Sequence, residues 1–380
     1  MPPRVLFLTL KVFGFTGGIE KVCRSICRSL YDLGEENIVE PTVYSMYDKY
    51  FDRDSRYLKK QQYHAFNEHR KYFVIKSLIK GIRSDVIILS HINLLSVGYL
   101  IKRFSPKTKV YLLAHGIEIW RKLPEPKLKA LKRLDKIIAV SHFTAEKIKS
   151  IHGIKAEKME ILNNCIDPFY FFPENFSKPK PLLERYGLNS NQKILMSLSR
   201  VVSSEKYKGY DNTISILPEL IKKYPEVVYL IAGKSDEEEK SRLEKLIAKH
   251  QIASHIKLIG FIDEAEITDH FLLSDIFVMP SKKEGFGIVF IEAMASGLYV
   301  VAGNKDGSVD ALKDGELGKL VNPDDSNEIE KTLDELLKAP LNHEEKITLQ
   351  KNVLQAFSYE KYRESIKKLI VHGTSYLMFL

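Results

Sequence analysis

The chain contains 380 residues, which is too long for one ordinary hydrophobic core and suits two domains. Hydrophobic residues make up 44% and charged residues 28% of it, a composition that excludes disordered and fibrous proteins. Three cysteines are too few for a disulfide framework, and the apolar run Val86–Ile101 is interrupted by polar residues. We therefore expect a cytoplasmic protein without a membrane-spanning helix.

Charge is divided unevenly along the chain. Residues 1–176 contain 30 Lys and Arg against 18 Asp and Glu, whereas residues 177–380 contain 28 against 31. Because a basic surface attracts anions, the difference indicates that only the first half faces an anionic partner.

Short apolar runs alternate with longer amphipathic segments, a pattern typical of βα units. Many runs are continuous stretches of Val, Ile and Leu, as in parallel strands that helices cover on both faces. In the first half we predict strands at Arg4–Thr9, Thr42–Met46, Asp85–Leu89, Lys109–Ala114, Lys136–Val140 and Met159–Leu162. In the second half we predict strands at Lys193–Ser199, Val227–Ala232, Ile256–Ile259, Asp275–Met279, Leu298–Ala302 and Lys319–Val321.

A proline-rich segment, Asp167–Pro181, separates the two sets of strands and is interpreted as a linker. The pattern predicts an α/β protein with two Rossmann-like, doubly wound domains, residues 1–175 and 176–357, facing a central cleft. A C-terminal helix within 358–380 is expected to pack back onto the first domain. Ligands of such sheets bind at the carboxyl ends of the strands, so the site is expected there.

A glycine-rich loop, Phe13–Ile19, joins the first strand to a helix that begins near Gly18. Its order G-x-x-G-G differs from the G-x-G-x-x-G of nicotinamide-dinucleotide sites. The glycines are equally compatible with a simple turn. His115 ends another strand of this half, a position where a lone histidine is more often structural.

Two cations follow the first strand of the second half. Arg200 lies directly after the strand and Lys208 precedes a helix, a placement suited to neutralising a pyrophosphate. Lys206 competes with Lys208 for this role, and either lysine is also compatible with ordinary surface charge.

The most informative segment is Pro280–Gly297, in which a strand, a glycine-containing loop and a helix follow one another. Gly285 and Gly287 allow the backbone to approach a ligand, and the helix start offers amides to a phosphate. Glu284 and Glu292 are carboxylates of the kind that accept paired sugar hydroxyls. The alternative is that Glu284 caps the helix and Glu292 is solvated. The apolar neighbours of Glu292 favour ligand binding, because a buried carboxylate needs a partner.

Glu284 and Glu292 form an E-x7-E pattern, and their segment resembles that of family-4 retaining glycosyltransferases. The cation segment, the glycine loop and His115 resemble further motifs of that family in the same order along the chain. The resemblance implies the two-domain GT-B fold. It also implies a retaining enzyme that moves a sugar from a nucleotide-diphospho-sugar to a glycan or lipid-linked acceptor in cell-envelope polysaccharide or glycolipid synthesis, with UDP and GDP left open.

The resemblance implies a role for each matching residue. It makes His115, which is directed at the transferred sugar, catalytic together with Arg200, Lys208 and Glu284. Gly303 and the turn Asp306–Ser308 follow the Glu292 helix and are expected to border the sugar pocket. The expected donor-binding residues are Gly17, Gly18, Gly233, Gly260, Phe261, Gly285, Phe286, Gly287, Ile288, Val289 and Glu292.

Family members of this fold generally need no divalent metal, so we expect no metal and no cofactor besides the nucleotide-sugar co-substrate. Asp52-Arg53-Asp54 has the form of a metal-binding D-x-D motif. It follows a polar, tyrosine-rich stretch, and Arg53 would oppose a cation, so we interpret it as a solvated loop.

Two basic amphipathic stretches, Lys59–Arg83 and Arg121–Lys136, are equally compatible with contact to an anionic membrane and with solvated helix faces. No nucleic-acid-binding module accompanies them. Two other functions stay open on the same fold: a non-catalytic sugar-nucleotide-binding protein and a sugar-nucleotide epimerase. Turnover with an acceptor distinguishes all three.

Overall fold

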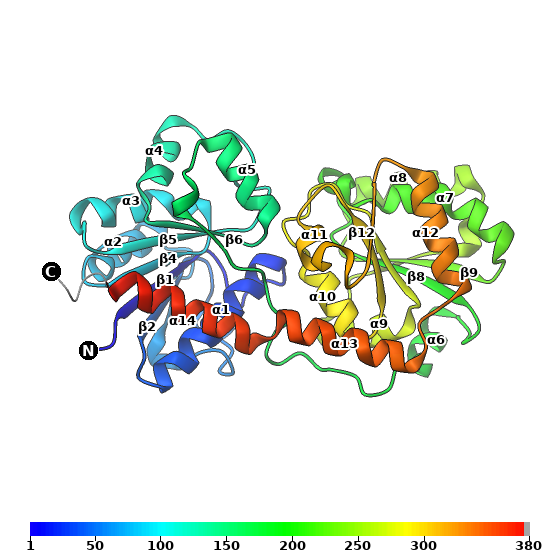
Figure 1. The fold of residues 1–380 in the computed structure, drawn as a ribbon, viewed down its shortest axis with the longest axis horizontal. Coiled ribbons are helices and arrows are strands. Elements are labelled where there is room, and N and C mark those ends of the chain that lie inside the picture. Colours follow the sequence, from blue (N-terminus) through cyan, green and yellow to red (C-terminus); the bar gives the residue numbers. More distant parts are fainter. Residues whose placement is uncertain (376–380) are drawn as a thin grey trace. The chain divides into compact units, whose positions relative to one another are not determined.

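The structure is a computed structural model that describes residues 1–375, with side chains as far as Val371, and it divides into two compact units (Figure 1). Unit 1 comprises Met1–Pro168 together with the chain from Phe357 onward, and unit 2 comprises Phe169–Ala356. The first change of unit therefore falls a few residues before the boundary at 175 that the sequence suggests. It lies within the proline-rich linker.

Within the described residues, unit 1 is built on a seven-stranded sheet of order β3-β2-β1-β4-β5-β6-β7, in which all neighbours are parallel. Its strands are β1 Arg4–Thr9, β2 Glu40–Ser45, β3 Tyr63–Ala65, β4 Val86–Leu89, β5 Lys109–Ala114, β6 Lys136–Ala139 and β7 Met159–Ile161. Its helices are α1 Gly18–Glu35, α2 Arg70–Gly81, α3 Leu95–Phe104, α4 Glu125–Arg133, α5 His142–His152 and α14 Tyr359–Ser375.

Helices pack on both faces of this sheet. One core joins Leu8, Leu89 and Leu112 of the strands to Phe73 of α2 and Ile101 of α3. Strand residues that point the other way meet α1 and α14. Helix α1 forms because its buried apolar residues repeat at helical spacing, as Val22, Cys23, Ile26, Cys27, Leu30 and Leu33. Both cysteines are thus packing residues of α1.

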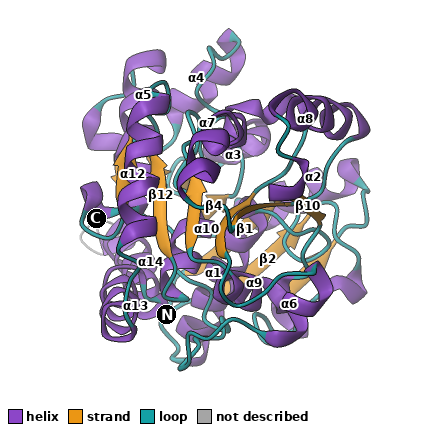
Figure 2. Cartoon of the chain, turned by 90° about the vertical axis from the view of Figure 1, so that its right-hand side faces the viewer, coloured by secondary structure: helices purple, strands orange, loops and turns teal. Residues whose placement is uncertain are grey.

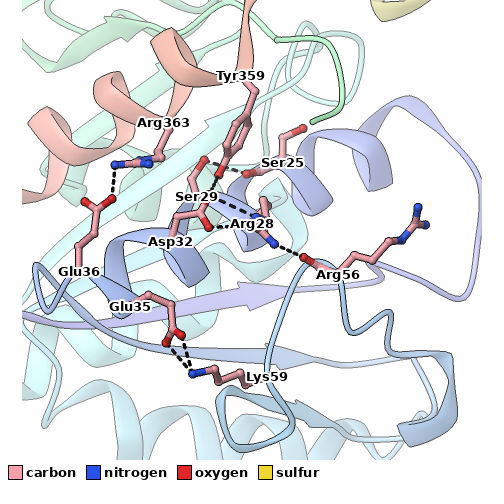
Figure 3. A network of polar contacts seen from close by, with 10 residues as sticks. All are labelled: Ser25, Arg28, Ser29, Asp32, Glu35, Glu36, Arg56, Lys59, Tyr359 and Arg363. Atoms are coloured by element: carbon pink, nitrogen blue, oxygen red, sulfur yellow. Dashed lines mark hydrogen bonds and ion pairs between the residues drawn. The ribbon is translucent and has the colours of Figure 1, made fainter. Parts of the chain in front are cut away.

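Polar contacts hold α14 on α1 (Figure 3). The Tyr359 hydroxyl donates to Asp32 at 2.6 Å, and Arg363 donates to Glu36 at 2.6 Å. Arg28 pairs with Asp32 at 2.8 Å, one turn earlier on α1. The last described helix is therefore part of unit 1, although α13 before it lies in unit 2.

Within residues 1–375, unit 2 is built on a six-stranded parallel sheet of order β10-β9-β8-β11-β12-β13. Its strands are β8 Lys193–Leu198, β9 Val227–Ala232, β10 Ile256–Gly260, β11 Ile276–Met279, β12 Tyr299–Gly303 and β13 Lys319–Val321. Its helices are α6 Lys180–Tyr186, α7 Tyr210–Lys223, α8 Glu237–His250, α9 Ile267–Leu273, α10 Ile288–Ala295, α11 Ser308–Ala311, α12 Ser326–Lys338 and α13 His343–Phe357.

The strands of unit 2, orange in Figure 2, are flanked by helices on both faces. One core joins strand residues such as Tyr229 and Val278 to α7, α8 and α12. On the other face Phe277 of β11 stacks edge-on with Phe271 of α9 and Phe290 of α10. Two doubly wound, Rossmann-like units are thus confirmed. Strand β3 is the one strand of the described chain that the sequence analysis misses.

In the part of the chain that the structure describes, no helix has the length and apolar character needed to cross a bilayer. Loops at the carboxyl ends of the parallel strands carry most of the predicted site residues. Those of unit 1 follow β1 and β5, and those of unit 2 follow β8, β9, β10 and β11.

Candidate functional site

The loop Pro280–Gly287, between β11 and α10, carries the first carboxylate of the E-x7-E pattern. The Glu284 carboxylate forms an ion pair with Lys208 and accepts a hydrogen bond from its Nζ at 2.6 Å. Both side chains are largely buried. Burial lowers the pKa of Lys208, but the charge and hydrogen bond of Glu284 outweigh it, so that the pKa is raised. Lys208 is thus held as a cation in a partly desolvated position, where a charge acts strongly on a ligand.

Tyr207 is a half-buried residue close to several charged side chains of unit 2. Burial raises the pKa of its phenol, and the charges that act on it belong to Lys208, Glu205, Glu284 and Arg200. The structure therefore brings together Arg200, Lys208 and Glu284, which the sequence separates by more than one element. Sequence reasoning missed Tyr207 and Glu205, because a tyrosine or glutamate in a polar stretch carries no signal of its own.

Arg200 is 67% exposed at the carboxyl end of β8 and pairs with the buried carboxylate of Glu205. The chain between them enters a short 3-10 helix, Ser203–Lys208, that ends at Gly209. Gly209 has a φ of 89°, and a Cβ there would lie 2.3 Å from the Pro280 carbonyl oxygen. The cation loop and the Glu284 loop consequently touch through their main chains, which only glycine allows at this position.

Glu292 lies inside α10 and is 2% exposed. Its main-chain carbonyl accepts a 3.2 Å hydrogen bond from the hydroxyl of Tyr170, whose pKa is raised by burial and by the nearby Glu292 carboxylate. The solvated alternative for Glu292 is therefore wrong. Gly287 begins the helix in the left-handed conformation, with φ 90°, and this turn places Ile288 and Val289 at the N-terminus of α10.

The remaining predicted donor residues of unit 2 follow β9, β10 and β11. Gly233 donates to the Gly260 carbonyl at 2.7 Å, and a Cβ on Gly233 would lie 1.6 Å from the Ser199 carbonyl oxygen. Phe261 is 62% exposed, whereas the Phe286 ring is buried. The ring of Phe261 is thus accessible to a ligand. Because the Phe286 ring serves packing, the main chains of Gly285 and Phe286 are the groups beside the start of α10.

The glycine loop of unit 1 leads into α1, close to Glu20. A Cβ on Gly17 would lie 2.5 Å from the Glu20 carboxylate. Burial raises the pKa of Glu20, and His115 is among the groups whose charge acts on it. Because His115 Nε2 bonds to the Ser90 carbonyl at 2.8 Å, this nitrogen carries the hydrogen, and Nδ1 of a neutral ring is the acceptor. Gly18 is the first residue of α1 and meets no atom within 4 Å of an added Cβ.

A buried carboxylate that sequence reasoning missed organises this loop. Asp48 accepts hydrogen bonds from the main-chain amides of Val12 (2.8 Å), Phe13 (3.2 Å) and Gly14 (3.0 Å). It also accepts from the hydroxyls of Ser45 and Tyr63, both at 2.8 Å. A lone aspartate after a strand gives no hint of this role in the sequence.

No group of three or more His, Cys, Asp or Glu side chains with the geometry of a metal site occurs among the described residues. Asp52 of the D-x-D sequence accepts from the Lys49 amide at 2.8 Å, and Asp54 pairs with Arg56. Both carboxylates therefore have partners within the loop.

A model described as Glycosyltransferase Family 4 matches residues 16–169, and a model described as Glycosyl transferases group 1 matches residues 181–353. A GDP-mannose-dependent alpha-(1-6)-phosphatidylinositol monomannoside mannosyltransferase of Mycolicibacterium smegmatis is 30% identical over 256 residues. The match covers 64% of each chain, just under two thirds of the relative. A D-inositol 3-phosphate glycosyltransferase of Catenulispora acidiphila is 29% identical, over 54% of this chain and 48% of the relative.

Two solved structures show the same fold. The Anabaena protein Alr3699/HepE, in complex with UDP and glucose, has a TM-score of 0.77 and 20% identity, with 97% of this chain and 100% of that chain covered. Sucrose-phosphate synthase of Thermosynechococcus elongatus has a TM-score of 0.75 and 18% identity, over 98% of this chain and 99% of that chain. Both family models occur in order on two Rossmann-like units, and the chain therefore belongs to glycosyltransferase family 4, with the GT-B fold.

Proposed function

We propose that the protein is a retaining glycosyltransferase that moves a sugar from a nucleotide-diphospho-sugar to a glycan or lipid-linked acceptor, without a metal or other cofactor. The observation that carries this proposal is the partly buried ion pair of Lys208 and Glu284, which joins two strand-end loops of unit 2 at 2.6 Å. In this proposal Lys208 is the cation that faces the leaving diphosphate, and Glu284 is the carboxylate that accepts the sugar hydroxyls.

In the proposed donor complex, unit 2 binds the nucleotide-sugar. Glu292 accepts from the ribose hydroxyls, and the amides at the start of α10 near Ile288 face the pyrophosphate. Lys208 and Arg200 neutralise the charge that grows on the diphosphate as the bond between sugar carbon and phosphate oxygen breaks. Arg200 is 67% exposed, and in the proposed complex it turns from Glu205 toward the phosphate.

The chemical step proposed is front-face attack. The acceptor hydroxyl oxygen bonds to the anomeric carbon of an oxocarbenium-like sugar on the face that the diphosphate leaves. The bonding electrons depart with the diphosphate, and one of its oxygens takes the hydroxyl proton. Retention follows because both bonds lie on one face of the sugar. His115 of unit 1 is proposed to contact the transferred sugar through its Nδ1 acceptor.

The relatives support a phosphoinositide or another lipid-linked polyol as the acceptor class. The mannosyltransferase of Mycolicibacterium smegmatis is named for GDP-mannose and for a phosphatidylinositol monomannoside, and the glycosyltransferase of Catenulispora acidiphila for D-inositol 3-phosphate. A donor panel of UDP- and GDP-sugars with lipid-linked and soluble polyol acceptors tests the proposal. We expect transfer that survives excess EDTA and a product with the donor's anomeric configuration by NMR. Donor isomerisation without transfer would instead identify an epimerase, and binding without turnover a sensor.

The choice between the two candidate lysines is tested directly. Lys208→Ala should abolish most transfer, whereas Lys206→Ala, a matched loss of an exposed charge two residues away, should leave it within about twofold. Equal losses in both variants would contradict the assignment of Lys208.

We also propose that unit 1 contacts an anionic membrane through α2. Its buried residues Phe73, Ser77 and Gly81 define an inner face, and the outer face bears an exposed apolar row of Tyr72, Ile75, Ile79 and Ile82. This row, with the basic residues Lys71, Lys76, Lys80 and Arg83, is called the α2 patch. An apolar row among cations suits the surface of anionic lipids, to which each basic residue adds about 1 kcal/mol.

Flotation with anionic and neutral vesicles tests the α2 patch. We expect recovery with phosphatidylserine-containing vesicles only, and loss of that recovery in the double variant Ile75→Glu, Ile79→Glu. Ile161→Glu, on edge strand β7 of the same unit, is the matched control and should float like the wild type. Equal recovery of wild type and double variant would exclude this contact.

A further inference from the structure

The loops after β11 and β12 lie against each other at the carboxyl edge of unit 2. Their strands are parallel neighbours, with Met279 opposite Ala302. A Cβ on Gly303 would lie 2.0 Å from the Ser281 carbonyl oxygen. A Cβ on Gly307 would lie 2.0 Å from the Gly285 carbonyl oxygen. The second loop thus supports the Glu284 loop through direct main-chain contact.

Asp306 joins the two loops with its carboxylate. Oδ2 accepts from the Ser281 hydroxyl and from the Glu284 amide, both at 2.7 Å, and Oδ1 accepts from the Ser308 amide at 3.0 Å. The Gly307 amide in turn donates to the Glu284 carbonyl at 2.8 Å. Both main-chain polar groups of Glu284 are therefore held by consecutive residues of the second loop.

The main-chain amides of Glu284 and Ser308 can only donate, so the position requires an acceptor at both oxygens. An asparagine has one acceptor and one donor in the same shape. Whichever way its amide turns, its NH2 group faces either the Ser308 amide or the Ser281 and Glu284 donors. Only a carboxylate satisfies both loops at once.

Asp306 is 0% exposed, and burial raises the pKa of its carboxyl to about 6 despite the hydrogen bonds that it accepts. Ionisation of this group at neutral pH therefore opposes folding. A buried charge that costs stability is often retained at functional sites, where it fixes the geometry of groups that touch the ligand.

We propose that Asp306 is a positioning residue that sets Glu284 for the sugar end of the donor. It acts through the main chain of Glu284, whose side chain in turn contacts Lys208. The inference rests on the proposed function, because it takes Glu284 to contact the transferred sugar. Since Glu292 and the start of α10 lie outside this pair of loops, Asp306 is expected to affect sugar recognition and transfer far more than nucleotide binding.

The test compares two ligands on one variant. Calorimetry with UDP and GDP measures the nucleotide end, and steady-state transfer with the matching sugar nucleotide measures the whole donor. In Asp306→Asn we expect kcat/KM to fall about 10- to 100-fold, because small misplacements of a site group have effects of that size, while nucleoside-diphosphate affinity stays within about threefold. Gly307→Ala, which places a Cβ against the Gly285 carbonyl, should give the same split.

Asp324→Asn is the matched control. Asp324 also bridges the two loops, since it pairs with Lys282 and with Lys305, but at the surface and without touching Glu284. It should stay within about twofold of wild type in both measurements.

Three results would overturn the inference while leaving the proposed function intact. The first is that Asp306→Asn transfers sugar as fast as an active wild type. The second is that Asp306→Asn or Gly307→Ala loses nucleotide affinity and transfer to the same extent. The third is that Asp324→Asn loses as much transfer as Asp306→Asn. A wild type that neither binds nor uses any donor of the panel would instead contradict the proposed function itself.

Discussion

The two units use the same device at their strand ends. In unit 1, Asp48 follows β2 and holds the loop after β1, its neighbour in the sheet. In unit 2, Asp306 follows β12 and holds the loop after β11, again a neighbour. Both aspartates are fully buried. In each unit, a carboxylate at the end of one strand thus fixes the site loop that follows the neighbouring strand of the sheet.

The two carboxylates differ in what they hold. Asp48 accepts from three consecutive main-chain amides, Val12 to Gly14, and from two hydroxyls. Asp306 accepts from one amide of the site loop, that of Glu284, and one hydroxyl of it. Asp48 therefore determines the path of a whole loop, whereas Asp306 aligns one residue. We expect Asp48 to affect mainly the stability of the fold and Asp306 to affect mainly sugar transfer.

The largest effect should come from removing the unit 1 carboxylate. Asp48→Ala leaves five donors without their acceptor, and we expect a loss of about 3 to 5 kcal/mol in the free energy of unfolding. Urea denaturation followed by far-UV circular dichroism measures it. Asp52→Ala, in the adjacent turn, should cost less than about 1 kcal/mol, and similar losses in both would contradict the role of Asp48.

Transfer should depend more on unit 2 than on unit 1. Lys208→Ala removes the cation proposed for the diphosphate, and we expect kcat to fall about 100- to 1,000-fold. His115→Gln keeps polar groups near Ser90 and should lower kcat about 10-fold. Single-turnover transfer with saturating donor measures both. A greater loss in His115→Gln would reverse the assignment of the main catalytic charge to unit 2.

The pH dependence of stability should distinguish Asp306 from a neutral substitute. Its pKa is about 6 in the folded protein against 3.8 as the ordinary value, so the folded state binds the proton more tightly than the unfolded state. Wild-type stability should therefore fall relative to Asp306→Asn as the pH rises from about 4 to about 6, by up to about 3 kcal/mol. Urea titrations of both proteins across this range measure the difference. A stability difference between the two proteins that stays constant with pH would show that burial does not raise the pKa of Asp306.

The smallest effect concerns the polar contacts between α14 and α1 (Figure 3), which add to the buried packing of Tyr362, Ile366 and Ile370. Tyr359→Phe removes the 2.6 Å hydrogen bond to Asp32, and a loss of about 1 kcal/mol is expected. Thermal denaturation of this variant beside Tyr50→Phe, which alters an exposed tyrosine of the same unit, measures it. Equal melting temperatures of the two variants would show that the packing of α14, rather than this bond, keeps it in place.

Much of the fold is predictable from local patterns. Strands such as Arg4–Thr9 and Val227–Ala232 are continuous apolar runs, and their bounds agree with the structure to the residue. Strand β3, Tyr63–Ala65, escapes prediction because it is three residues long and lies at the edge of the sheet. Its pairing with β2, which no local pattern encodes, makes it a strand.

The candidate site divides in the same way. Glu284 and Lys208 are recognisable in the sequence because their motifs are local, and Glu292 because a charge among apolar residues is unusual. Asp48 and Tyr207 are not, since an aspartate after a strand and a tyrosine in a polar stretch are ordinary residues until neighbours from elsewhere surround them. The turn that holds Asp306 is expected near the sugar pocket, but the sequence does not show which donors its carboxylate binds.

By itself, the sequence determined the alternation of strands and helices, the two-unit architecture and the segments that bear the site, because hydrophobic periodicity and glycine-containing motifs act over a few residues. The tertiary structure decided which carboxylates are buried and which donors they satisfy. Those partners come together only when parallel strands distant in sequence become neighbours, and a carboxylate removed from water depends on those partners to remain charged.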